Sequence, residues 1–78
     1  MDIKEFSTQV SELIEGELRI SIKSDDEELD IDSFTMMLVI TFIEEEAGVK
    51  LDMDKLDFDA FKSIGTLKKL TFGESVNN

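Results

Sequence analysis

The chain has 78 residues, no cysteine and no histidine, and a formal net charge of −11 from 19 acidic and 8 basic residues. This composition excludes a disulfide-stabilised fold and a zinc site built from thiolates or imidazoles, and its charge repels nucleic acids and anionic membrane surfaces. We therefore expect one small cytoplasmic domain, a monomer with no nucleic-acid or membrane partner, steered toward proteins with basic patches.

The N-terminal third of the sequence predicts one helix followed by a long loop. Apolar residues recur at helical spacing over residues 3–18, from Ile3 and Phe6 to Ile14, and Asp2 precedes them as an N-cap. Residues 19–32 are then predicted as an extended loop, because Ile20 and Ile22 suggest a strand that has no partner. Six acidic residues lie in the segment that runs from Asp25 to Asp32, these two included.

The rest of the chain predicts a second and a last helix, with one short helix between them. Residues 34–46 form the second helix, capped by Asp32 or Ser33 and stopped at Gly48. We expect the short helix over roughly residues 56–61 and the last helix after Ser63, with a fraying tail from residue 73 to residue 78. No internal repeat is expected. The predicted fold class is all-α, with three main helices and one short one.

The second helix carries two apolar faces, which is one more than a core requires. Its predicted core face holds Met36, Val39, Ile40, Ile43 and Ala47. The opposite face holds Phe34, Met37, Leu38 and Thr41, with Phe42 at its flank, and Glu44 and Glu45 continue it. Either a small bundle covers both faces, or the second face is a docking surface. The segment from residue 25 to residue 46 contains nine acids and no base, which favours docking.

Ser33 and the acidic loop are the candidates for chemistry. A serine nucleophile needs a neighbouring base, and the chain has no histidine, so we expect no catalytic residue and no enzyme. An EF-hand loop that began at Asp25 would need glycine at its sixth position and glutamate at its twelfth, where this chain has Asp30 and Met36. We therefore expect no specific metal site. Ser33 is then a plain N-cap, or an exposed hydroxyl at a helix N-terminus, where an attached phosphate is favoured.

An ordered set of motifs resembles the acyl carrier protein family over nearly the whole chain. Asp32-Ser33-Phe34 follows an acidic loop and opens an apolar helix that ends in three glutamates, where the family commonly has Asp-Ser-Leu and Glu-Glu-Glu-Phe-Gly. Residues 47–51 (AGVKL) fit the continuation, and residues 61–67 (FKSIGTL) resemble the start of the family's last helix. The resemblance implies a four-helix bundle of acyl-carrier type, in which a long loop joins the first two helices.

The same resemblance implies a cofactor and partners. Ser33 would carry 4′-phosphopantetheine from coenzyme A, attached by a phosphopantetheinyl transferase with the help of Asp32. Acyl groups bound to the arm as thioesters would pass between acyl-transferring or acyl-activating enzymes with basic patches, in fatty-acid, polyketide or related lipid biosynthesis. The implied docking residues are Phe34, Met37, Leu38, Thr41, Glu44 and Glu45. The implied acyl pocket is bordered by Met36, Val39, Ile40, Ile43, Leu51 and Phe61.

Several alternatives stay open from the sequence. Thr35 and Leu38 stand where fatty-acid carriers often have acids, which favours a specialised carrier. An aminoacyl or peptidyl carrier, such as a D-alanyl carrier, has the same attachment chemistry. An acidic helical adaptor with an unmodified Ser33 belongs to another class, and a divalent-cation sensor to a third.

Overall fold

The chain folds around three α-helices. The computed structural model describes residues 1–73, and in that part it contains α-helices and short 3₁₀-helices and no strand. The elements are α1 (Ile3–Leu18), α2 (Ser33–Glu46), η1 (Met53–Lys55), η2 (Phe58–Phe61) and α3 (Ile64–Phe72). The predicted all-α class is therefore confirmed. A fraying tail was predicted for residues 73–78, and residues 74–78 of that tail lie outside the described residues.

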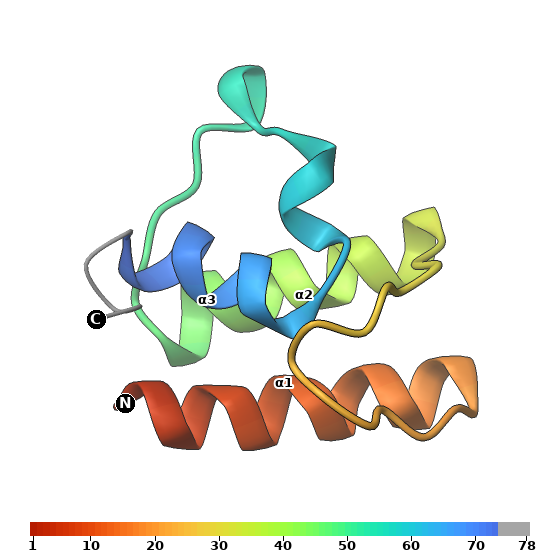
Figure 1. The fold of residues 1–78 in the computed structure, drawn as a ribbon. Helices are drawn as coiled ribbons and strands as arrows, with labels where there is room; N and C mark the ends of the chain where they lie inside the picture. The colour runs from red at the N-terminus through yellow and green to blue at the C-terminus, as the bar shows by residue number, and fades with distance from the viewer. Residues whose placement is uncertain (74–78) are drawn as a thin grey trace.

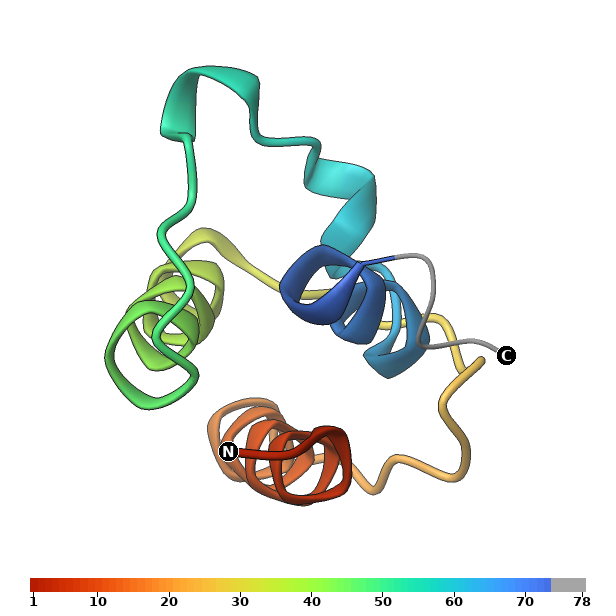
Figure 2. The ribbon, with the colours of Figure 1, turned by 90° about the vertical axis from the view of Figure 1, so that its left-hand side faces the viewer.

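The three α-helices surround a single core. α1 packs against both α2 and α3, and η2 packs against α3 (Figure 1). Figure 2 shows the three helices nearly end-on, at the corners of a triangle, with η1 at the edge farthest from α1. α2 and α3 pack less closely against each other than each of them packs against α1, so α1 connects these two helices.

Side chains set the ends of α1 and α3 as the sequence predicts. The Asp2 carboxylate accepts a hydrogen bond from the Glu5 amide at 2.8 Å, and the Glu5 carboxylate accepts one from the Asp2 amide at 3.3 Å, which completes a capping box. Ser63 caps α3 by accepting the Thr66 amide at 3.1 Å. These bonds satisfy backbone amides that a helix leaves without partners at its first turn.

The core face of α2 differs from the expected one at its ends. Val39, Ile40 and Ile43 are buried as predicted, but Met36 and Ala47 are only partly buried. Thr35, which the pattern does not place in the core, is 1% exposed. The Thr35 amide donates to the Asp32 carboxylate at 2.7 Å, and a hydrogen bond from the Thr35 side chain to the same carboxylate lets a polar residue be buried there.

Three phenylalanines link the three helices at one end of the core. The ring of Phe6 in α1 lies 5.8 Å from that of Phe42 in α2 and 5.4 Å from that of Phe72 in α3, measured between centroids. Phe6 itself is fully buried. Phe42, expected at the flank of the outer face of α2, is partly buried and turns toward α1 instead.

The long acidic loop, residues 19–32, is fixed to the start of α3. The Leu29 amide donates to the Lys62 carbonyl at 2.6 Å, and the Leu29 side chain is buried in the core. The Gly65 amide donates to the Asp25 carbonyl at 2.9 Å, and Lys68 pairs with the Asp25 carboxylate. A Cβ at Gly65 would lie only 3.3 Å from the Asp25 carbonyl oxygen, so glycine permits this close approach. The loop is therefore part of the packed domain.

The segment between α2 and α3 contains a short tandem repeat, and the expectation of no repeat is wrong. Leu-Asp-Met-Asp-Lys (51–55) is followed directly by Leu-Asp-Phe-Asp-Ala (56–60). The first aspartate of each copy, Asp52 or Asp57, accepts the amide two residues on, at 3.1 and 2.9 Å respectively. Each copy forms one 3₁₀ turn. η2 lies within the short helix predicted over residues 56–61, and η1 is an additional turn that was not predicted. We call residues 51–60 the tandem turns.

Replacing Thr71 by valine is expected to stabilise the domain. Thr71 is 7% exposed, and its buried hydroxyl has no hydrogen-bond partner within residues 1–73. Removing such a group is worth about 1 kcal/mol, which corresponds to a rise of about 4–8 °C in Tm for a domain of this size. Thermal unfolding followed by circular dichroism measures the change. The matched control is Thr41→Val, at an exposed position of α2, and an equal rise in both variants would contradict the explanation.

Candidate functional site

Asp32 caps α2, which settles the choice that the sequence left open between Asp32 and Ser33. The Asp32 carboxylate accepts the Thr35 amide at 2.7 Å, and its carbonyl accepts the Met36 amide at 2.9 Å. α2 consequently begins at Ser33, one residue earlier than expected. Ser33 is the first helical residue and not the cap.

This arrangement leaves the Ser33 hydroxyl at the surface with no structural task in the cap. Ser33 is exposed, at the end of α2 where the helix dipole is positive. The backbone amides of a first helical turn favour a negatively charged group close by. The amides of this turn would therefore favour the charge of a phosphate ester on the exposed Ser33 oxygen, and the Asp32 carboxylate beside it would oppose that charge.

The carboxylate next to Ser33 is held in its charged form. Two hydrogen bonds from Thr35 lower the pKa of Asp32; the bond from its amide has the larger effect and the bond from its side chain the smaller. Desolvation by burial has a lesser, opposite effect and raises the pKa. The folded-state pKa lies below the unfolded value, so this cap contributes stability at neutral pH and loses it as the pH falls through the folded-state pKa. Asp32 is thus an ionised, exposed group beside the serine across the physiological range.

The predicted docking residues divide into an exposed stripe and two edge positions. Phe34 is 65% exposed and Met37 is 55% exposed, and Thr41 and Glu45 are also exposed along the same face of α2. Leu38 and Glu44 are partly buried at the edges. No element of residues 1–73 covers Phe34 and Met37, so the alternative in which a bundle encloses α2 on both sides is wrong for the start of the helix.

Glu44 has a structural contact in addition to any docking role. Its carboxylate accepts the Leu51 amide at 3.3 Å, which ties the last turn of α2 to the start of the tandem turns. Glu45, one residue further on, is exposed, and no such bond involves its side chain within residues 1–73. A test of docking is therefore clearer at Glu45 than at Glu44.

The six residues predicted to border an acyl pocket all belong to the core or to its margin. Val39, Ile40, Ile43 and Phe61 are buried in it. Met36 and Leu51 are partly buried and pack against it from α2 and from the loop that follows. All six residues therefore belong to one hydrophobic cluster, to which α2 contributes four and the segment after it two.

Two acids of the long loop have structural partners in addition to the capping Asp32. Glu27 accepts the Lys23 amide at 2.7 Å, and Asp25 pairs with Lys68. Within residues 1–73 no group of three or more carboxylates is placed to hold a metal ion. None of the helices described is long and apolar enough to cross a membrane.

Two features of the site region escaped the sequence analysis, although a signal for each was present. The spacing of Asp32 and Thr35 is that of a cap and the residue three positions on, which would have placed Thr35 in the first turn beside the cap. The repeated Leu-Asp-x-Asp pattern of the tandem turns was visible as a period of five residues.

No family model, curated protein or solved structure matches this chain.

Proposed function

We propose that the chain is a carrier protein that bears 4′-phosphopantetheine on Ser33 and presents thioester-bound acyl groups to partner enzymes. The observation that carries the proposal is the exposed Ser33 hydroxyl on the first turn of α2, where Asp32 performs the capping. The arm would supply the thiol that a chain without cysteine lacks. The residues of the chain would position the arm and its cargo, and the partner enzymes would do the chemistry.

Ser33 and Asp32 have separate roles in this proposal. The Ser33 oxygen forms the phosphodiester, and the amides at the start of α2 favour its negative charge. Asp32 remains ionised because of its bonds from Thr35, so it can share a divalent cation with the incoming phosphate while the transferase acts. The same carboxylate holds the first turn, so the attachment point and the helix are fixed together.

The partners in this proposal are a phosphopantetheinyl transferase and acyl-transferring or acyl-activating enzymes with basic patches. They would dock on the exposed stripe of α2, where Phe34 and Met37 offer apolar area and Glu45 offers charge. The cargo would rest at the margin of the core, beside Met36 and Leu51. An acyl-carrier arrangement of the helices and a monomeric state belong to the same proposal.

One observation favours a second candidate function, an acidic adaptor that is never modified. The exposed Phe34 and Met37 would serve a protein-binding surface equally well without an arm on Ser33. Modification of Ser33 separates the two candidates. Within the carrier class, an aminoacyl or peptidyl cargo is an alternative to a fatty-acyl or polyketide one.

The deciding experiment is the intact mass of the chain after incubation with coenzyme A, Mg²⁺ and a phosphopantetheinyl transferase of broad specificity. We expect the gain of one phosphopantetheine, lost in Ser33→Ala and kept in Ser24→Ala, which changes an exposed loop serine. If several transferases leave the mass unchanged, the carrier proposal is wrong and the adaptor takes its place.

A further inference from the structure

The acidic loop is fixed to α3 by bonds that also complete the start of that helix. The Gly65 amide belongs to the first turn of α3, where a helix leaves its amides without partners of its own, and it donates to the Asp25 carbonyl at 2.9 Å. The Asp25 carboxylate pairs with Lys68, three positions further along α3. A residue of the loop thus caps α3 from outside, so the loop and the start of α3 are ordered together.

The same loop is held at a second point, close to Ser33. The Leu29 amide donates to the Lys62 carbonyl at 2.6 Å, and the Leu29 side chain is buried in the core. Three residues further on, Asp32 caps α2. Three residues of extended chain reach about 10 Å, so Asp32 and Ser33 cannot move far while Leu29 stays in place. Figure 1 shows the loop, in orange and yellow, passing the start of α3 before it reaches α2.

Gly65 permits the loop and α3 to come this close. A Cβ placed at Gly65 would lie 3.3 Å from the Asp25 carbonyl oxygen, which is closer than an ordinary van der Waals contact. A larger side chain there would therefore push the loop away from α3. A Cβ placed at Gly16 in α1 meets nothing within 4 Å. Glycine inside a helix costs stability, and the close approach of the loop accounts for that cost at Gly65.

We propose that four residues form a clamp that positions Ser33 for modification, namely Asp25 and Leu29 of the loop and Gly65 and Lys68 of α3. The inference rests on the proposed function, because it concerns the same serine, and it makes Gly65 and Lys68 positioning residues for the transfer to Ser33. The closed clamp presents Ser33 on a formed first turn of α2. When the clamp opens, the loop loses its anchors on α3 and the α2 cap loosens, so only the closed fraction of the chains is competent for the transferase.

The kinetic test measures phosphopantetheine transfer to the full chain in two variants that weaken the clamp, Gly65→Val and Lys68→Met. A smaller closed fraction lowers the apparent affinity of the transferase for the chain and leaves the bound complex as it was. We therefore expect KM for the chain to rise by about fivefold or more, with kcat unchanged. Lys68→Arg keeps the charge that faces Asp25 and should keep KM within about twofold of the parent.

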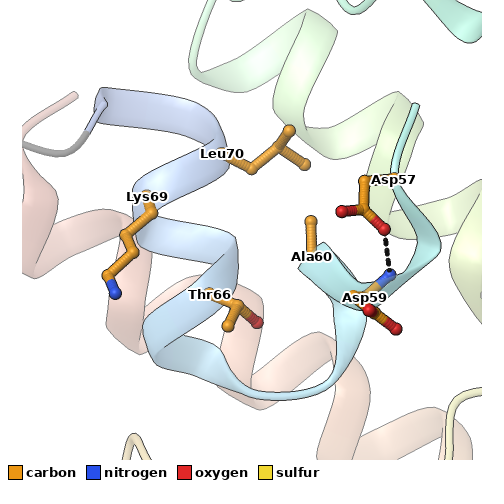
Figure 3. Close-up of a pocket in the computed structure, with 6 residues that line it drawn as sticks. All are labelled: Asp57, Asp59, Ala60, Thr66, Lys69 and Leu70. Carbon is orange, nitrogen blue, oxygen red and sulfur yellow. Dashed lines mark hydrogen bonds between the residues drawn. The ribbon is translucent and has the colours of Figure 1, made fainter. Parts of the chain in front are cut away.

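Three controls separate the clamp from side-chain size, charge and global stability. Gly16→Val makes the same change in open space on α1. Lys69→Met removes the same charge from a residue that lines a surface hollow between η2 and α3, where Figure 3 shows it on α3 with Thr66 and Leu70. Val10→Ala truncates a fully buried side chain of α1 and lowers the stability of the whole domain. All three should keep KM within about twofold.

Amide hydrogen exchange, followed by NMR, tests the clamp without a transferase. The Leu29 amide reports the clamp, and the Thr35 amide, which donates to Asp32, reports the α2 cap. We expect both amides to exchange about tenfold faster in Lys68→Met and by the same factor as each other, because one local opening exposes both. Val10→Ala does not touch the loop anchors, so local opening there should be unchanged.

Faster exchange at Leu29 without faster exchange at Thr35 would overturn the proposal, because the clamp would then not reach the start of α2. So would a KM close to that of the parent in both clamp variants, or an equal rise of KM in Val10→Ala, which would assign the effect to global stability. A parent chain that no transferase modifies contradicts the proposed function itself, and the positioning role falls with it. Coupled exchange at Leu29 and Thr35 would then leave the clamp as a property of the fold alone.

Discussion

Replacing Phe6 by alanine is expected to leave much of the chain unfolded at room temperature. Phe6 is fully buried and touches Phe42 and Phe72, so its loss removes contacts between α1 and both other helices. Truncating a buried phenylalanine costs about 3–5 kcal/mol, and a single core in so short a chain supplies only about 3–5 kcal/mol of stability. The measurement is urea unfolding followed by circular dichroism.

Phe58→Ala is the matched control for this prediction. The same substitution at a side chain that is 67% exposed should change the free energy of unfolding by at most about 0.5 kcal/mol. If Phe6→Ala unfolds cooperatively with a midpoint close to that of the parent chain, Phe6 is not the link between the helices. Equal losses in both variants would mean that packing around Phe58 has been underestimated.

The helices were predictable because their signals are local. Asp2 and Ser63 lie directly before apolar residues at helical spacing, and the structure uses both as caps. The long loop was also predictable, because Ile20 and Ile22 suggest a strand for which the sequence offers no partner. The start of α2 was predicted to within one residue, since Asp32 and Ser33 are both good caps and sequence alone does not rank them.

The remaining features depend on contacts between distant residues or on geometry within one turn. The attachment of the acidic loop to α3 joins Asp25 to Gly65 and Lys68, some forty positions apart in the sequence, and no periodicity encodes it. Burial of Thr35 depends on its bonding to Asp32 and runs against the rule that places polar residues outside. For the candidate site, Ser33 and its neighbours were predicted from the sequence. Only the structure shows that Asp32 is the cap of α2 and that Ser33 is an exposed helical residue.

The exposed stripe of α2 leads to the last prediction, which concerns docking. Met37→Ser combined with Glu45→Lys is expected to lower kcat/KM for phosphopantetheine transfer to Ser33 by on the order of a hundredfold. Met37 offers apolar area at 55% exposure, and the change at Glu45 places a cation where a basic partner would approach. Both side chains are exposed, so the helical content should be unchanged. The transfer rate is followed by mass spectrometry at several chain concentrations.

The control must distinguish an effect of the exposed face of α2 on the transfer rate from an effect of the net charge of the whole chain. Glu12→Lys on α1 makes the same change in net charge at an exposed position, and it should leave kcat/KM within about twofold. Glu45→Lys alone should have an effect that shrinks as salt is added, because screening weakens interactions between exposed charges. If Glu12→Lys slows transfer as much as Glu45→Lys, the partner senses the overall field of an acidic chain. Docking on the stripe beside Ser33 would then have to be abandoned, although Ser33 could still be the point of attachment.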